Sequence, residues 1–337
     1  MRPSRDRVTI GDVAEQAGVS IATVSRVVNG RYGVAPGTFT RVQAVIADLG
    51  YESSLVARSL RSRRTNVIGI IVADIEPFSA ELLKGAARAI HGTGYELIVY
   101  SGGGHAEDQV GWERRYLSRL NGTLTDGTIL VTPTVVEVSS GAPVVAVDPH
   151  AGSSTLPTVD SQNLEGAVAA TEYLISLGHR RIGFLSGRPD LESARLRELG
   201  YRAALERAGI EFDPDLVGVG GYKPESAEAP ARELLQLSHP PTAIFAANDV
   251  SAIQTMEVAR SLGLTVPDDL SVIGFDNIPE SALANPPLTT IDQSIQEMGF
   301  EAARLLIGLI DEPGKSPTHL TLPTELVIRQ SCRAPTS

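Results

Sequence analysis

The chain has 337 residues, enough for two or three domains that each bury a hydrophobic core. Hydrophobic residues make up 42% of it and the apolar runs are no longer than strands, which excludes a membrane-spanning segment. A single cysteine excludes an intrachain disulfide and a multi-cysteine zinc site, and no secretory signal is visible near the first residue. We therefore expect a cytoplasmic protein.

The net charge of −11 is distributed unevenly along the chain. Residues 1–64 hold ten arginines and five acidic residues, which gives +5, whereas the remaining 273 residues hold 19 basic and 35 acidic residues, which gives −16. A uniformly acidic protein would be a poor partner for nucleic acid. A basic head on an acidic body instead favours a separate DNA-binding module.

The first expected elements are two short helices joined by a tight turn. Apolar residues recur at helical spacing over Ile10–Ala17, with Thr9 placed to cap this helix and Gly18 to end it. Ser20 can cap a second helix with valines on its inner face, and a third helix is expected over Pro36–Leu49. This spacing is typical of a helix-turn-helix.

The second helix of such a unit enters the major groove with its N-terminus first. Its exposed positions would be Ile21, Ala22, Ser25 and Arg26. Only Arg26 can make a bidentate contact to guanine, whereas the two apolar residues can touch thymine methyl groups. Short polar side chains at Ser20, Thr23 and Asn29 are of the kind that hold phosphates. The alternative is an ordinary three-helix domain with an incidental exposed arginine.

From Asn66 onward, apolar strand-sized runs alternate with amphipathic helices, after an arginine-rich stretch, Ser53–Arg64, that we interpret as a hinge. The expected strands are Val67–Val72, Glu96–Tyr100, Gly127–Val131, Val144–Val147, Arg181–Ser186, Val217–Val219, Ala243–Ala246 and Leu270–Phe275. The expected helices are Ala80–Ile90, Trp112–Leu120, Glu165–Leu177, Ala194–Ala208, Ala227–Leu237 and Ala252–Leu262. This βαβ rhythm, repeated twice, predicts two doubly wound parallel sheets with ligand sites at their carboxyl ends.

The motifs, taken in order, resemble the LacI/GalR (lac repressor) family of bacterial transcriptional regulators. The likeness is densest from Asp12 to Asn29 and continues in core segments such as Leu177–Gly183, Ser193–Tyr201 and Val266–Asp276. Each segment alone is a weak signal, but the ordered set is strong and covers essentially the whole chain. The resemblance implies an α/β protein with an all-α helix-turn-helix head, a hinge helix and a periplasmic-binding-protein-like core of two doubly wound parallel-sheet subdomains.

The resemblance also implies the domain bounds. Residues 1–52 would form the DNA-binding domain, residues 53–64 the hinge helix and linker, and residues 65–337 the ligand-binding core. Within the core, one subdomain would take about 65–162 and 293–322, and the other about 163–292 and 323–332.

In that family the hinge helix wedges a leucine into the minor groove at the operator centre, a device that bends DNA. Leu60 matches this leucine, with Ala57 on the same face, although the approach Glu52–Ser54 departs from the usual Pro-Asn. A linker with an incidental leucine is the alternative. The predicted DNA-binding residues are Thr9, Ser20, Ile21, Ala22, Thr23, Ser25, Arg26, Asn29, Ala57 and Leu60.

A sugar-like ligand needs polar side chains that fork onto neighbouring hydroxyls and aromatic walls that cover its ring. By match to the family, Arg197 and Asp276 would be polar anchors, Asn248 a hydroxyl partner and Tyr222 an aromatic wall. The other expected contacts are Phe78 and Ser79, in the loop after the first core strand, and Asp148 and Gln293, which end a strand and begin a crossover. A structural ion pair between Arg197 and Asp276 is the alternative, and packing or solvated loops for the rest.

The sequence departs from the family in two loops that would face the ligand. Asp74–Phe78 lacks the common asparagine before Pro-Phe, and Val159–Asn163 lacks the common Asp-Asn arrangement, so either Asp160 or Ser161 could face the ligand. These departures bear on which ligand binds, not on the fold.

These features together predict a ligand-responsive regulator, a repressor that binds a palindromic operator as a homodimer. A sugar or small glycoside in the cleft would close the two subdomains and alter the spacing of the hinges. A sugar-binding transport receptor with the same core is the alternative, disfavoured by the head and the missing signal segment.

No catalytic motif and no metal-ligand spacing is present, so no enzyme, cofactor or metal is expected. After Leu326–Ile328 no heptad pattern follows, which favours a dimer over a tetramer.

Overall fold

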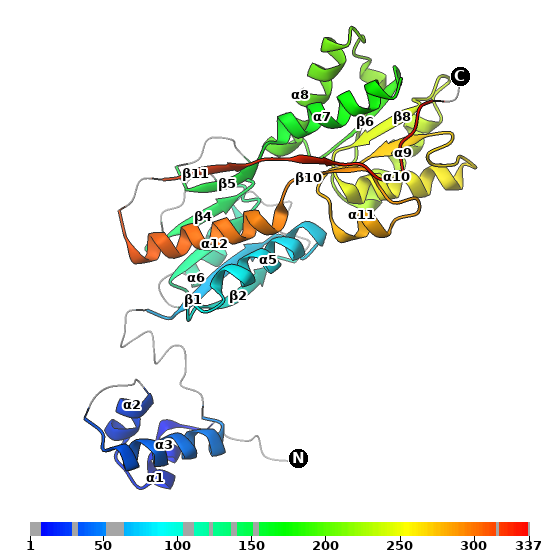
Figure 1. Ribbon diagram of the computed structural model, residues 1–337. Helices are drawn as coiled ribbons and strands as arrows, with labels where there is room; N and C mark the ends of the chain where they lie inside the picture. The colour runs from blue at the N-terminus through cyan, green and yellow to red at the C-terminus, as the bar shows by residue number, and fades with distance from the viewer. Residues whose placement is uncertain are drawn as a thin grey trace. The chain divides into compact units, whose positions relative to one another are not determined.

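The computed structural model describes residues 8–28, 33–51, 64–103, 111–120, 124–135, 140–150, 155–314 and 317–335. The chain divides into two compact units, Met1–Thr65 and Asn66–Ser337 (Figure 1). Three residues of the predicted DNA-binding set, Asn29, Ala57 and Leu60, lie outside the described residues, as does most of the predicted hinge. The predicted bounds of the head, the hinge and the two subdomains therefore stay predictions.

The first unit is built from α1 (Ile10–Ala17), α2 (Ile21–Val28) and α3 (Pro36–Leu49). Thr9 caps α1 in a reciprocal capping box with Asp12, whose carboxylate accepts from the Thr9 backbone N–H at 2.7 Å. Gly18 ends α1 in the left-handed conformation, which permits the sharp turn into α2. The three helices agree with those expected from the sequence. Their buried residues form one core: Val13, Ala14, Ala17, Val24, Val27 and Val42.

The second unit begins with a six-stranded parallel sheet in the order β11-β5-β4-β3-β1-β2. Its strands are β1 (Val67–Val72), β2 (Glu96–Ser101), β3 (Gly127–Val131), β4 (Val144–Val147), β5 (Thr158–Ser161) and β11 (His319–Leu322). We call this sheet, with α5 (Pro77–Ile90), α6 (Trp112–Leu120) and α12 (Ile295–Asp311), the N-subdomain.

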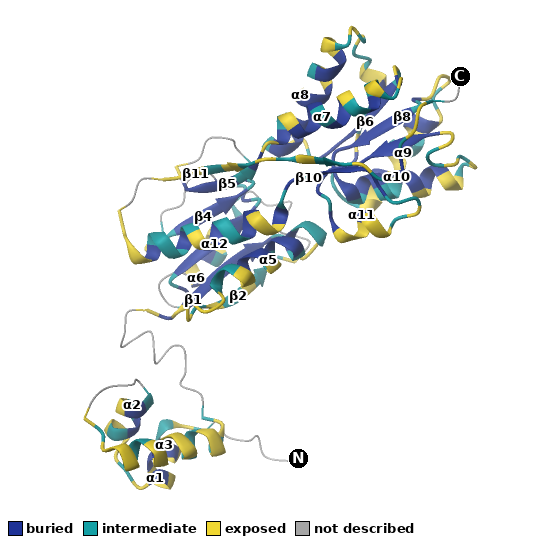
Figure 2. Ribbon diagram, in the orientation of Figure 1, coloured by how far each residue is buried: buried dark blue, intermediate teal, exposed yellow. Residues whose placement is uncertain are grey.

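Helices cover both faces of this sheet, because successive side chains of a strand point to opposite faces. Ile68, Ile70 and Val72 of β1 pack with α5 and α12, whereas Ile71 packs with α6 on the other face. Every residue of β1, β3 and β4 is consequently buried, and Figure 2 shows this for β4. Such continuous burial explains why these strands read as uninterrupted apolar runs in the sequence.

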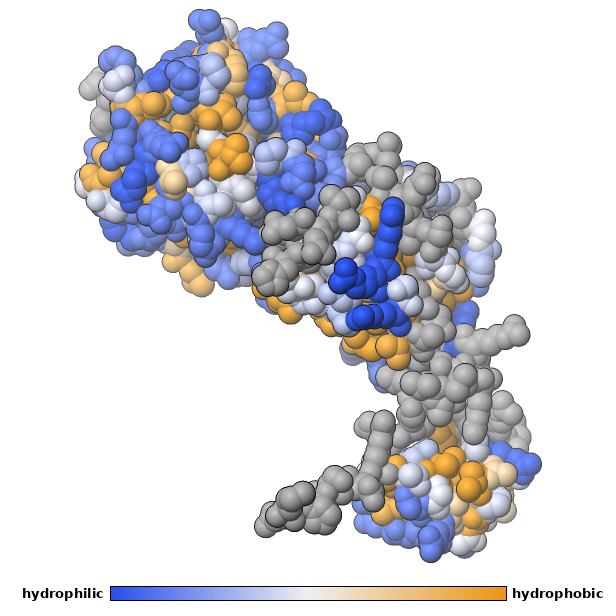
Figure 3. Space-filling model, turned by 180° about the vertical axis from the view of Figure 1, so that it is seen from behind, coloured by the Kyte–Doolittle hydropathy of each residue, from blue (hydrophilic) through white to orange (hydrophobic). Residues whose placement is uncertain are grey.

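A four-stranded parallel sheet in the order β7-β6-β8-β9 forms the centre of what we call the C-subdomain. Its strands are β6 (Ile182–Ser186), β7 (Val217–Val219), β8 (Ala243–Ala246) and β9 (Ser271–Ile273). On one face lie α7 (Asn163–Ser176) and α8 (Glu192–Arg207), and on the other α9 (Pro224–Leu235) and α10 (Asp249–Ser261). The described surface of this subdomain is mostly hydrophilic in the view from behind, with hydrophobic residues in separate patches (Figure 3).

The chain passes three times between the subdomains (Figure 1). It leaves β5 for α7, returns from β10 (Thr290–Asp292) to α12, and leaves β11 for β12 (Glu325–Val327). β10 and β12 pair antiparallel beside the crossing points. The two parallel sheets confirm the predicted fold class, but β5, α11 (Pro279–Leu283) and every element from β10 onward were not predicted.

Candidate functional site

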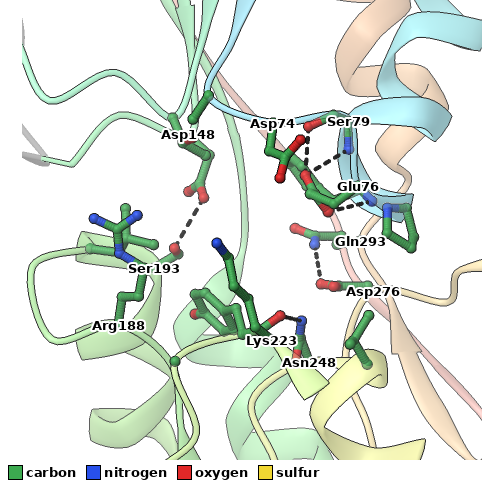
Figure 4. A pocket seen from close by; sticks show the side chains of 18 of the residues that line it. Asp74, Glu76, Ser79, Asp148, Arg188, Ser193, Lys223, Asn248, Asp276 and Gln293 are labelled. Carbon is green, nitrogen blue, oxygen red and sulfur yellow. Dashed lines mark hydrogen bonds between the residues drawn. The ribbon is translucent and has the colours of Figure 1, made fainter. Parts of the chain in front are cut away.

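A cavity of about 270 Å³ lies between the two subdomains, at the carboxyl ends of their strands. Chain segments directly after β1, β3, β4, β6, β7, β8 and β9 all contribute to its wall, as expected for doubly wound sheets. Figure 4 shows Asp148 and Ser193 on one side, Gln293 and Asp276 on the other, and Lys223 extending between them. The lining residues are Ala73, Asp74, Glu76, Pro77, Phe78, Ser79, Thr132, Asp148, Arg188, Leu191, Ser193, Arg197, Gly221, Tyr222, Lys223, Pro224, Asn248, Val250, Asp276 and Gln293.

Arg197 on α8 is the centre of a buried polar network and is only 3% exposed. Its Nε donates to Asn163 at 2.9 Å and its Nη1 donates to the Ala247 carbonyl at 2.5 Å. Nη1 also lies 3.4 Å from a carboxylate oxygen of Asp276, and the guanidinium carbon lies 3.8 Å from the centre of the Phe275 ring. The arginine is thus fixed by the protein, with a stacked face and an ionic partner.

Asp276 lies between Arg197 and Gln293. Its Oδ1 accepts from the Gln293 side-chain amide nitrogen Nε2 at 2.5 Å. The side-chain oxygen of Gln293, Oε1, in turn accepts from the Ser161 hydroxyl at 2.9 Å. Burial raises the pKa of Asp276 to about 7, against the lowering effect of Arg197. Burial thus opposes the charged form of this carboxyl, and the neighbouring guanidinium favours it.

The opposite side of the cavity has a contact that joins the two subdomains. The Ser193 hydroxyl of α8 donates to Asp148 Oδ2 at 3.0 Å, and Asp148 directly follows β4 of the N-subdomain. Burial raises the pKa of Asp148, and the charge of Arg197 opposes this. Asn248 on the C-subdomain caps α10, because its side-chain oxygen accepts from the Ser251 backbone N–H at 3.0 Å.

Phe78 and Ser79 lie in the first turn of α5, which begins at Pro77. The prediction that they belong to a loop was wrong, because Glu76 caps this helix three residues earlier than expected. Its carboxylate accepts from the backbone N–H groups of Phe78 at 2.9 Å and Ser79 at 3.0 Å. A helix N-terminus therefore brings these two side chains to the cavity.

Four cavity residues have a backbone that non-glycine residues rarely adopt. The φ angles are 46° at Thr132, 46° at Asp148, 68° at Tyr222 and 118° at Asp276. Such conformations cost free energy and cluster at sites of function. Four residues that line the cavity thus have backbone conformations of higher energy than an ordinary loop would adopt.

The surface of α2 matches the expected reading face of a helix-turn-helix. Ile21 is 52% exposed, and Ala22 and Arg26 are also exposed, whereas Val24 is buried. Ser25, which was predicted to be exposed as well, is half-buried. Ser20 caps the helix, since its hydroxyl accepts from the Thr23 backbone N–H at 3.2 Å. The side chains predicted to touch base edges thus face solvent on one side of α2.

Comparison with known proteins finds a matching family model for each of the two units. The family model "Bacterial regulatory proteins, lacI family" matches residues 9–54, and "Periplasmic binding protein-like domain" matches residues 171–332. The HTH-type transcriptional regulator CelR of Thermobifida fusca is 34% identical over 342 residues, covering 97% of this chain and 99% of CelR. The chain belongs to the lacI family.

Solved structures of lacI-family proteins agree with this assignment. The CelR–cellobiose complex superposes with a TM-score of 0.72 at 33% identity, covering 96% of this chain and all (100%) of that one. The lac repressor dimer bound to operator and the anti-inducer ONPF gives 0.84 at 28% identity, covering 98% and 100%. This lacI-family chain is accordingly a DNA-binding transcriptional regulator and not an enzyme. Among the described residues, no helix has the length and apolarity needed to cross a membrane.

All eight residues predicted to bind ligand in this lacI-family core line the cavity between the subdomains. Arg197 and Asp276 also form the ion pair that was the alternative interpretation, so the two interpretations are compatible. Asp160 and Ser161 do not line it, and Ser161 instead supports Gln293. The ligand contacts themselves stay a prediction.

Several cavity residues of this lacI-family chain were not predicted from the sequence. Most of them lie within a few residues after the end of a strand, as Ala73 and Asp74 do after β1, whereas Ser193 lies in the first turn of α8. The polar and charged residues that were not named as contacts are Asp74, Glu76, Thr132, Arg188, Ser193 and Lys223, of which the first two belong to a loop that was expected to face the ligand.

Replacing Gly187 with alanine should displace the aromatic wall of the cavity. A Cβ at this position would overlap the end of the Tyr222 ring, so the ring must move or the backbone must shift. We expect the free energy of unfolding to fall by about 1 kcal/mol, measured by urea denaturation. The double variant Gly187→Ala/Tyr222→Ala should lose no more than Tyr222→Ala alone. Additive losses would show that the ring does not lie against Gly187.

Proposed function

We propose that this lacI-family regulator is a cytoplasmic repressor that binds a palindromic operator as a homodimer and is controlled by a sugar or small glycoside. The observation that supports this most directly is one cavity, between the subdomains, with polar side chains and an aromatic residue from each subdomain. A ligand that contacts both subdomains stabilises the closed arrangement by the difference between its binding free energies to the closed and the open form.

A neutral, hydroxyl-rich ligand fits the charges of this cavity. Its wall holds three basic side chains, Arg188, Arg197 and Lys223, against four carboxyl groups, of which Asp276 has a pKa of about 7. The wall is therefore close to electrically balanced, which disfavours a strongly charged ligand. Phe78 and Tyr222 offer apolar surface to a ring, and the fixed arginine and carboxyl groups can fork onto vicinal hydroxyls. The relative CelR was solved with cellobiose, which supports the same ligand class.

The proposed domain organisation follows the sequence: residues 1–52 bind DNA, residues 53–64 form the hinge with Ala57 and Leu60 at the minor groove, and residues 65–337 sense the ligand. Ligand binding would change the angle between the subdomains and so the spacing of the two hinges in the dimer. Operator affinity would then rise or fall by the coupling free energy between the two sites.

The test is a gel shift of the full-length protein on the DNA upstream of its own gene, with a panel of sugars. The expected result is a shift of a palindromic site that at least one sugar weakens or strengthens. The protein should bind a single half-site far more weakly than the palindrome, since each protomer of a dimer contacts one half of the palindrome. Binding that no sugar alters, or equal affinity for half-site and palindrome, would contradict the proposal.

Replacing Arg26 with alanine should weaken operator binding more than binding to random DNA. A bidentate arginine–guanine contact provides about 1–3 kcal/mol of discrimination, so we expect a loss of about 5- to 150-fold on the operator. Arg41→Ala is the matched control, because Arg41 is an exposed arginine on α3 and its removal deletes the same charge. Equal losses on operator and random DNA for Arg26→Ala would assign this arginine to phosphate contact.

A further inference from the structure

A second contact joins the two subdomains beside the cavity, and neither of its two residues lines the cavity. His150 follows β4 of the N-subdomain, and Asp190 lies between β6 and α8 of the C-subdomain. The His150 Nδ1 and the Asp190 Oδ2 are 3.1 Å apart. The histidine side chain is 11% exposed and the aspartate side chain 51%, so the pair lies at the edge of the closed region.

Asp190 also fixes a residue of the cavity wall. Arg188 donates through Nε to Asp190 Oδ1 at 3.1 Å and through Nη2 to Oδ2 at 2.8 Å, a bidentate pair. Arg188 itself lines the cavity. One carboxylate therefore connects a histidine of one subdomain to a cavity arginine of the other.

We propose that His150 and Asp190 form a latch that holds the two subdomains closed and positions Arg188. The part of this that concerns the ligand rests on the function proposed above. The latch itself concerns only the closure of the core. His150 and Asp190 act as positioning residues, because they reach the cavity only through Arg188.

The charge state of the latch follows from its surroundings. A carboxylate only accepts hydrogen bonds, so a neutral His150 must carry its proton on Nδ1 to donate to Asp190. Three groups face the ring: Asp190, which favours a charged ring, Arg188, which disfavours it, and the backbone of Thr132, which favours it. Burial is the largest effect, and it lowers the pKa of His150 below the ordinary value of 6.5.

The test is hydrogen–deuterium exchange of the full-length protein at pH 7.5, without ligand or DNA. The variants are His150→Ala, Asp190→Asn and His150→Gln, which keeps a hydrogen-bond donor at this position. His91→Ala is the control, because His91 is an exposed histidine of the same subdomain. The readout is protection of residues 188–195 in the C-subdomain, across the cleft from His150.

The latch predicts that His150→Ala and Asp190→Asn each lower protection of this segment about tenfold at pH 7.5. His150→Gln should keep most of the protection, because its side-chain amide can still donate to Asp190. Changes confined to residues 144–150 in His150→Ala, or a loss in His150→Gln as large as that in His150→Ala, would overturn the proposal. Failure of every sugar in the gel shift would leave these exchange results unaffected, so the two proposals fail separately.

Discussion

Replacing Arg197 with methionine should abolish the response to the sugar that acts on the wild-type protein and lower the free energy of unfolding by about 3–5 kcal/mol. The arginine is buried against Phe275 and hydrogen-bonds Asn163 and the Ala247 carbonyl. Its removal leaves the carboxyl of Asp276 buried without a cation, which raises the pKa of Asp276 further and leaves it protonated at neutral pH. Urea denaturation measures the stability, and the operator gel shift measures the response.

The companion variants are Asp276→Asn and the double variant Arg197→Met/Asp276→Asn. Asparagine keeps the shape of the aspartate and can accept from Gln293, but it needs no cation nearby. The double variant should therefore be more stable than the sum of the two single losses predicts. Strict additivity would show that the two side chains are independent, and a full sugar response in Arg197→Met would remove this arginine from the ligand site.

Replacing Gly85 or Gly299 with alanine should cause the largest loss of stability from the addition of a single methyl group, about 3 kcal/mol or more. The two glycines lie where α5 and α12 cross in the N-subdomain. A Cβ at Gly85 would overlap the backbone carbonyl of Gln296, and one at Gly299 would overlap that of Leu82. Neither obstacle is a side chain that can rotate away, so the helices must separate and open the core between them.

Gly308→Ala is the matched control on the same helix. A Cβ at Gly308 would meet nothing within 4 Å, and alanine favours a helix interior over glycine. We therefore expect Gly308→Ala to raise the free energy of unfolding by about 0.5–1 kcal/mol in the same urea titration. A loss at Gly308 as large as that at Gly85 would mean that the cost comes from the backbone of the substituted helices and not from their crossing.

The DNA-binding unit could be predicted almost to the residue, because its helix ends are encoded locally. The capping box at Thr9, the left-handed Gly18 and the left-handed Gly50 after α3 all appear in the sequence as end signals. By contrast, α12 was missed although its apolar residues recur at helical spacing. Its start carries no such signal, since Ser294 has φ 57° and makes no side-chain cap.

The cavity could be predicted in part, and for reasons that differ between residues. Six of the eight expected residues came from resemblance to a family, and Asp148 and Gln293 came from their positions where a strand ends and a crossover begins. Such a position does not by itself tell which way a side chain points, so Arg188 and Lys223 were not predicted. The pairing of His150 with Asp190, 40 positions apart, depends on how two subdomains close. Only the tertiary arrangement brings such residues together, so no local pattern in the sequence encodes them.

The threefold passage of the chain between the subdomains also determines the order in which the core can be completed during synthesis. The N-subdomain begins first, but α12 supplies Met298, Ala302 and Leu306 to its core, and β11 supplies its last strand. Both elements leave the ribosome only after the whole of the four-stranded sheet. The part of the core that starts earliest must therefore keep apolar surface uncovered until nearly the end of translation, which makes it a natural client for a chaperone.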